Sequence, residues 1–133
     1  GRLPPAIGCQ LYYALIDCHL THACDIVIDV DYTSLELLDS LNRALLHRIL
    51  GVGKRSGVVQ LYSELGIYPL RVHRIQLALH YLRYLVQLPD LHLAHKALLE
   101  GDNLRSRGVS SWIGDLEIVL GNLPFAMPRG YCF

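Results

Sequence analysis

The segment 18–24, with the sequence CHLTHAC, gathers four side chains that could bind a metal ion. Cys18 and His22 are four residues apart, so they would share one face of a helix, and Cys24 follows two residues later. The spacing matches no strong zinc-binding signature. The alternative interpretation is that the cysteines are buried apolar side chains and that the histidines cap helices or lie at the surface.

A second small cluster contains His92 and His95, which are three residues apart and follow Asp90. It could bind a metal ion or work as an acid–base pair, and the alternative is the exposed polar face of a helix. The sequence contains no nucleophile elbow, no zinc-protease motif and no dinucleotide-binding motif. We therefore expect no cofactor and no catalysis by the chain alone. A small metal-dependent nuclease that uses the His and Asp clusters is the less favoured alternative.

Basic side chains are concentrated in the middle of the chain, although the net charge is zero. Residues 1–41 carry one base and six acids, whereas residues 42–89 carry seven bases and one acid. The two blocks could attract each other within one fold, or the basic block could bind an anionic partner. The candidate nucleic-acid-binding bases are Arg43, Arg48, Lys54, Arg55, Arg71, Arg74 and Arg83.

Two aromatic side chains, Tyr81 and Tyr84, flank Arg83 and could stack on nucleic-acid bases. The alternative is ordinary helix packing with the phenol hydroxyls at the rim of the core. Arg74 falls among the apolar residues of the same predicted helix, so we expect it to be paired or directed at a partner.

The elements that position these residues are predicted to be helices of one domain, residues 1–133. Hydrophobic residues make up 52% of the chain and charged residues 18%, which excludes a disordered protein. No apolar run is long enough to span a bilayer, so we expect no membrane span. No signal peptide is visible, which favours an intracellular protein. The high apolar content also favours a homo-oligomer, because so small a domain has little polar surface with which to cover itself.

Helix signals divide the chain into five or six helices in a compact all-α bundle. A capping box at Thr33 and Glu36, Gly51 after an apolar run, and Pro69 before another mark three helix boundaries. Residues 25–31 could form a short extended piece or a loop, and residues 101–108 read as a polar loop. The predicted helices are 6–24, 33–50, 58–65, 70–88, 91–100 with Asp90 as its cap, and a last helix from Ser110 or Ser111 to 120.

The helix predicted over residues 70–88 carries one narrow polar stripe on an otherwise apolar surface. At 100° per residue this stripe contains His73, Gln76, His80, Arg83 and Gln87. The helix is therefore expected to be buried on most sides and to meet solvent, or a ligand, along the stripe.

Two sequence blocks in the middle of the chain have a distinctive form. Residues 45–51 read LLHRILG and residues 61–71 read LYSELGIYPLR. They resemble the LRRxLG and LYxELGxxPLR blocks that follow the palm in reverse transcriptases of non-LTR (LINE-type) retrotransposons. Residues 11–24 resemble the block before these two, and residues 71–85 the basic helix after them. Residues 97–100 and 110–116 resemble later elements as found in mushroom-forming fungi, so that the resemblance covers about residues 9–124.

The resemblance implies the helical thumb and connection of such a polymerase, without the palm that carries its catalytic aspartates. Without those aspartates the chain could not hold the two metal ions of nucleotide transfer. In the family, the thumb helices hold the backbone of the template–primer duplex, which implies weak binding of RNA or an RNA–DNA duplex. Some usual basic positions are His47, His73 and His80 here, and histidine is mostly neutral at pH 7. The alternative is a free-standing fungal protein, derived from such an element and reused for partner binding.

Overall fold

The described part of the chain is entirely helical in its regular structure. The computed structural model describes residues 4–53, 55 and 57–122, without the side chains of residues 58–61. Within these ranges there is no strand, and the helices form six segments, which confirms the predicted all-α bundle. No helix in the same ranges has the length and apolar character needed to cross a membrane.

The first helical segment consists of three elements that follow one another without a break. They are α1 (Pro5–Leu11), the π-helical turn η1 (Tyr12–Asp17) and α2 (Cys18–Leu20). Helix was predicted to continue to residue 24, and that prediction was wrong, because the chain leaves the helix after Leu20. Ala23 has a positive φ of 55°, which a helix does not accommodate. Residues 25–31 then form a turn and a loop.

Helix α3 (Tyr32–Leu50) begins one residue before the predicted cap. The side chain of Asp31, not that of Thr33, caps it, accepting hydrogen bonds from the Ser34 amide at 3.0 Å and the Ser34 hydroxyl at 2.6 Å. A carboxylate can satisfy both donors at once, which explains why the predicted capping box did not form here. Gly51 ends the helix with a φ of 67°, as predicted.

The second half of the chain contains four helices: α4 (Val58–Leu65), α5 (Leu70–Gln87), α6 (Leu93–Ser106) and α7 (Trp112–Gly121). The predicted boundaries of α4, α5 and α7 agree closely with these, and Ser111 caps α7. The prediction for α6 was wrong at both ends. His92 is its cap rather than Asp90, and the expected polar loop 101–108 is helical as far as Ser106.

The extension of α6 has a visible physical cause. Arg105 pairs with Asp102 one turn earlier at 2.6 Å and with Glu117 of α7 at 3.1 Å. Polar residues that looked like a loop thus form a helix surface held to its neighbour. The chain reverses afterwards at Gly108, whose φ is 75°.

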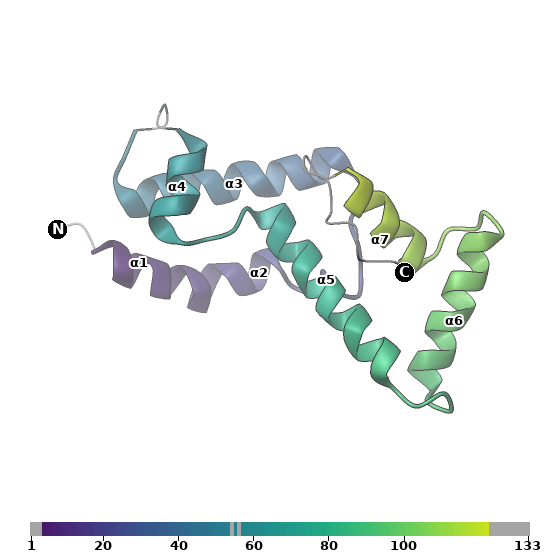
Figure 1. Cartoon of the computed structure of the whole chain (residues 1–133). Coiled ribbons are helices and arrows are strands. Elements are labelled where there is room, and N and C mark those ends of the chain that lie inside the picture. The colour runs from purple at the N-terminus through teal and green to yellow at the C-terminus, as the bar shows by residue number, and fades with distance from the viewer. Residues whose placement is uncertain (1–3, 54, 56, 123–133) are drawn as a thin grey trace.

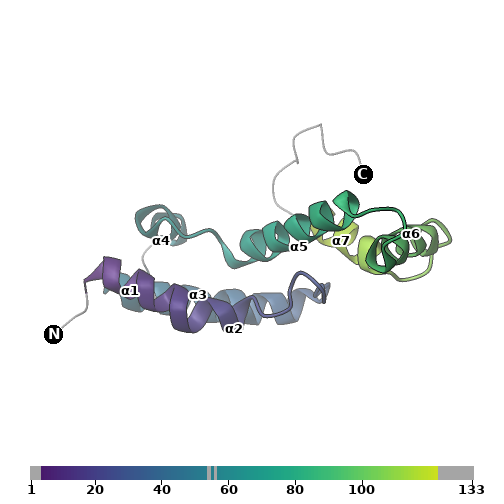
Figure 2. The same ribbon diagram turned by 90° about the horizontal axis from the view of Figure 1, so that it is seen from below.

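The helices lie in two layers. The segment α1–η1–α2 runs beside α3 in one layer, and α4, α5, α6 and α7 form the other, with α6 at the end remote from α1 (Figures 1 and 2). One apolar core lies where the layers meet and contains Tyr12, Leu20, Leu46, Ile67 and Leu70. A second core lies between α5 and α7 and contains Ala78, Leu82 and Leu116.

Two features fix the first layer internally. Gly8 allows α1 to approach α3 closely, because a Cβ at this position would lie 2.9 Å from Cγ2 of Ile49. The hydroxyl of the buried Tyr12 donates a hydrogen bond to Oδ1 of the fully buried Asn42 at 2.7 Å. The π-helical turn therefore begins at a residue that is anchored to α3.

Candidate nucleic-acid interface

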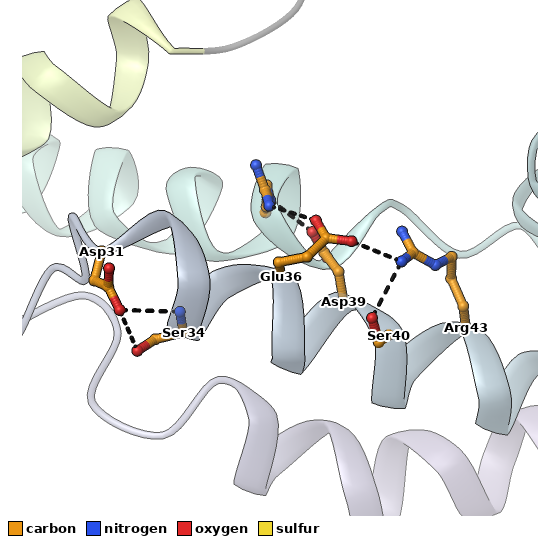
Figure 3. A network of polar contacts seen from close by, with 7 residues as sticks. Asp31, Ser34, Glu36, Asp39, Ser40 and Arg43 are labelled. Atoms are coloured by element: carbon orange, nitrogen blue, oxygen red, sulfur yellow. Dashed lines mark hydrogen bonds and ion pairs between the residues drawn. The ribbon is translucent and has the colours of Figure 1, made fainter.

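Two of the candidate bases, Arg43 and Arg71, belong to an ion-pair network with acids of α3. Nε of Arg71 donates to Oδ2 of Asp39 at 2.6 Å, and its Nη2 donates to Glu36 at 3.0 Å. Arg43 donates to the other oxygen of Glu36 at 2.9 Å, and Figure 3 shows Glu36, Asp39 and Arg43 along α3. The Arg71 guanidinium also lies over the ring of Tyr32, 4.6 Å from its centroid.

Arg74, on the next turn of α5, is also paired with an acid from the first third of the chain. It donates to Oδ2 of Asp29 at 2.6 Å and to the main-chain carbonyl of Leu20. Its side chain is only 12% exposed, which agrees with the expectation that it is paired. His73 Nε2 lies 3.4 Å from Oδ2 of Asp17. The structure thus pairs the acidic first third with the basic middle, so these bases hold the two layers together.

The remaining candidate bases are more accessible. Arg48, Arg55 and Arg83 are exposed and form no ion pair with any residue in the described ranges, while Lys54 lies outside those ranges. Arg48 lies in the last turn of α3 and Arg55 in the connection to α4, whereas Arg83 lies in the last two turns of α5. Of the seven predicted bases, three are therefore paired with acids and three are accessible.

Three histidines stand at usual basic positions of the resembled family, namely His47, His73 and His80. They also differ in their exposure to solvent. His47 is buried in α3, so it offers no charge to a ligand at the surface. It lies on a side of α3 that is covered. His80 is exposed on α5.

The polar stripe predicted for α5 is present and meets solvent along its second half. His80, Arg83 and Gln87 are exposed, whereas His73 and Gln76 are half-buried. Tyr84 is exposed beside this stripe and stacks on Tyr81 with a ring-centroid distance of 6.2 Å. Of the two candidate stacking residues, Tyr84 alone has an accessible ring.

Tyr81 serves the packing of the second core. Its ring meets that of Trp112 edge to face at 5.9 Å, and Nε1 of Trp112 donates to the carbonyl of Asp25 at 3.0 Å. The packing interpretation is therefore the one that fits Tyr81.

The half-buried start of the α5 stripe borders a cavity of about 200 Å³. Its walls come from η1, from the connection between α4 and α5, and from α5 itself. Its aromatic and polar lining residues are Tyr12, Tyr13, Asp17, Tyr68, His73 and Gln76. The pKa of the Tyr13 phenol is raised by burial and then by the negative charge of Asp17. The lining residues thus give the cavity aromatic side walls, formed by the tyrosines, and one carboxylate, that of Asp17.

A larger cavity of about 270 Å³ lies between the two layers. Its apolar walls include Ile28, Val72 and Ile75, and the paired side chains of Arg71 and Arg74 border it. Because both guanidiniums are already engaged by carboxylates, this cavity presents little uncompensated charge to a ligand.

The candidate metal ligands near the first helix do not converge. Cys18 and His22 are exposed, whereas Cys24 is buried with its thiol 3.9 Å from the carbonyl of Arg74. Across the described part of the chain, no three His, Cys, Asp or Glu side chains are grouped closely enough to hold a metal ion.

His92 and His95 have local structural contacts. His92 Nδ1 accepts a hydrogen bond from the Ala94 amide at the start of α6. His95 Nδ1 lies 3.0 Å from the carbonyl of Leu85, and its Nε2 lies 3.6 Å from Asp90. These contacts connect the start of α6 to the end of α5.

Comparison with known protein families, curated proteins and solved structures finds no match for this chain. The geometry therefore carries the functional argument. Sequence reasoning identified the polar stripe of α5 but missed the cavity at its start, because Tyr13 and Asp17 come from a segment distant in sequence. The available signal was the position of His73 and Gln76 on the stripe of a helix that is otherwise apolar.

Proposed function

We propose that the chain is a non-catalytic module that binds nucleic acid weakly along the polar stripe of α5. The observation that carries this proposal is the arrangement of that helix. Its buried apolar residues and the ion-paired Arg71 and Arg74 face the rest of the molecule, and its second half presents His80, Arg83 and the ring of Tyr84 to solvent. An accessible guanidinium beside an accessible aromatic ring suits a phosphate and its neighbouring base.

Fewer bases contact phosphate in this proposal than the sequence alone predicted. Arg43, Arg71 and Arg74 are neutralised by carboxylates of the same chain, so their contribution to phosphate binding is small. Arg83 provides the contact on α5, and Arg48 and Arg55 extend it at the α3–α4 end. With so few accessible bases, the binding is weak, and its dependence on salt is shallow, with a slope of about 0.7 for each phosphate contact to a single strand.

Fluorescence anisotropy with a labelled single-stranded RNA and a labelled RNA–DNA duplex tests the proposal. Replacing Arg83 and Tyr84 together by alanine should reduce affinity about tenfold or more, because a stacked base contributes about 1–3 kcal/mol. The matched control is Lys96→Ala, which removes an exposed positive charge from α6. Equal affinity of wild type, double variant and control would contradict the proposal.

The second candidate function is self-association, which is favoured by apolar side chains on the outer surface of the first layer. Leu15 of η1 is 61% exposed and Leu37 of α3 is 68% exposed, and Leu41 continues the α3 stripe one turn later. The segment α1–η1–α2 and α3 lie side by side in both views (Figures 1 and 2). An exposed apolar surface of this kind is typical of an interface between copies.

Sedimentation at micromolar concentration tests self-association. We expect a mass above that of a single 15.0 kDa chain, and a shift to the single-chain mass when Leu37 and Leu41 are replaced by glutamate. A single-chain mass for the wild type would contradict the self-association.

A further inference from the structure

The cavity at the start of the α5 stripe has features that packing does not require. Tyr13 and Tyr68 are 48% and 61% exposed, although each has a large apolar ring. The same cavity is lined by the carboxylate of Asp17, the imidazole of His73 and the amide of Gln76. Aromatic walls around a few convergent polar groups are typical of a ligand site.

We propose that this cavity binds a single guanine base of a nucleic-acid strand, and the inference rests on the proposed function. Asp17 offers two carboxylate oxygens, one of which lies 3.4 Å from His73 Nε2. Guanine presents two adjacent donors, N1–H and the N2 amino group, and a carboxylate accepts such a pair with both oxygens. The neighbouring O6 of guanine is an acceptor, which the amide of Gln76 or the imidazole of His73 satisfies as a donor.

The other bases match this arrangement less well. Adenine places the acceptor N1 beside its amino group, and cytosine places the acceptor N3 there, so each would set a lone pair against Asp17. Uracil has one donor between two carbonyl oxygens, so that one carboxylate oxygen accepts from N3–H while the other faces an acceptor. A polar group left unpaired in a half-buried site is costly, and this cost is the source of the preference for guanine.

The dimensions and the continuation of the cavity also fit a base within a strand. Its volume of about 200 Å³ lies below the range of about 300–1,000 Å³ found for drug-sized ligands. From His73 to Arg83 the helix rises about 15 Å, which corresponds to about four nucleotides stacked at 3.4 Å each. Arg83 and Tyr84 are therefore placed to contact the strand a few nucleotides from the bound guanine.

The test compares labelled eight-nucleotide RNAs that contain a single G, A, C or U in an otherwise constant abasic or uridine background. We expect the G oligonucleotide to bind about tenfold more tightly than the others, as one bidentate base contact allows. Asp17→Asn keeps the size of the side chain but puts a donor where guanine needs an acceptor, so it should abolish this preference. The matched control is Glu100→Gln, which neutralises an exposed carboxylate on α6 and should leave the preference intact.

A second variant covers the case in which Asp17→Asn fails to fold. Tyr68 lies in the exposed connection before α5, and Tyr68→Ala removes one wall of the cavity without touching the core. It should weaken the binding of the G oligonucleotide more than that of the A, C and U oligonucleotides. Equal weakening of all four would overturn the inference.

Free guanosine separates this inference from the proposed function. If no oligonucleotide binds but guanosine shifts the NMR signals of Tyr13 and Tyr68, the proposed function fails and the base site stands. If all oligonucleotides bind equally and guanosine shifts neither tyrosine, the proposed function stands and the base site is overturned. If tetramethylammonium shifts these signals and guanosine does not, the cavity is an organic-cation site, and the guanine-binding inference is also overturned.

Discussion

Replacing Arg71 by alanine would leave the carboxylate of Asp39 buried beside α5 without its cation. The Asp39 side chain is 10% exposed and accepts from Nε of Arg71 at 2.6 Å. Removing one partner of a buried ion pair costs about 3–5 kcal/mol, and one hydrogen bond to a charged group contributes about 1.5–3 kcal/mol. Because the Arg71 side chain is itself 27% exposed, water compensates part of the loss. We therefore expect the free energy of unfolding to fall by about 2–3 kcal/mol.

The assay is urea unfolding followed by circular dichroism, with thermal unfolding as a second measurement. A loss of this size should lower the melting temperature by about 10 °C in a chain of this length. The control is Arg48→Ala, which removes an exposed arginine of α3 and should change stability by less than about 0.5 kcal/mol. Adding Asp39→Asn to Arg71→Ala removes the buried charge and should restore part of the loss.

The result that would refute this reasoning is equal stability of Arg71→Ala and Arg48→Ala. Asp39 would then be hydrated, and the ion pair would not hold the two layers together. The basic middle segment would in that case be available to an outside partner, and Arg71 would return to the set of nucleic-acid contacts.

Three further predictions concern stability, at two glycines and at one buried tyrosine. Gly8→Ala should destabilise the fold by about 1–2 kcal/mol, because the new Cβ would meet Ile49 at 2.9 Å. Gly101→Ala, in the open interior of α6, should instead stabilise it by about 0.5–1 kcal/mol. Urea unfolding of both glycine variants measures these changes in the free energy of unfolding. Changes of the same sign in the two variants would contradict the prediction. Tyr12→Phe should cost about 1–3 kcal/mol, because Oδ1 of Asn42 loses its donor, and unchanged stability would argue against a buried hydrogen bond there.

The pH dependence of stability follows from the same tyrosine. Burial, and then the charge of Asp17, raises the pKa of Tyr12 well above its ordinary value of 10.0. Above that value the unfolded chain loses the phenol proton while the folded chain keeps it. The stability from this group is therefore complete below pH 10 and declines as the pH rises further. Unfolding measured between pH 9 and 11.5 should show this decline, and Tyr12→Phe should make it shallower; an identical slope in both proteins would assign the decline to other groups.

Much of the fold could be predicted because its boundaries depend on single residues with strong backbone preferences. Gly51 has a positive φ at the helix end where it was expected, Gly66 has one directly after the helix predicted over residues 58–65, and Pro69 precedes α5. The end of α6 could not be predicted in this way. Residues 101–106 remain helical because Arg105 finds partners one turn away and on α7, and the second partner depends on tertiary structure.

The candidate site was predicted less completely, for a related reason. The sequence showed a basic block and an acidic block but not which side chains would meet. The structure pairs Arg71 with Asp39 and Arg74 with Asp29 across 32 and 45 residues of sequence. Helical periodicity did predict the polar stripe of α5, because a stripe depends only on spacing within one helix. Its extension into a cavity depends on η1, which no local pattern connects to α5.

Nucleic-acid binding along α5 is best tested by the salt dependence of RNA binding, measured for the wild type and for Arg83→Ala. Each lost phosphate contact reduces the slope of log affinity against log salt by about 0.7 for a single strand and about 0.9 for a duplex. We expect Arg83→Ala to lower both the affinity and this slope, and Lys96→Ala to leave both unchanged. An affinity that does not vary with salt, or a slope that Arg83→Ala leaves unaltered, would contradict nucleic-acid binding along α5.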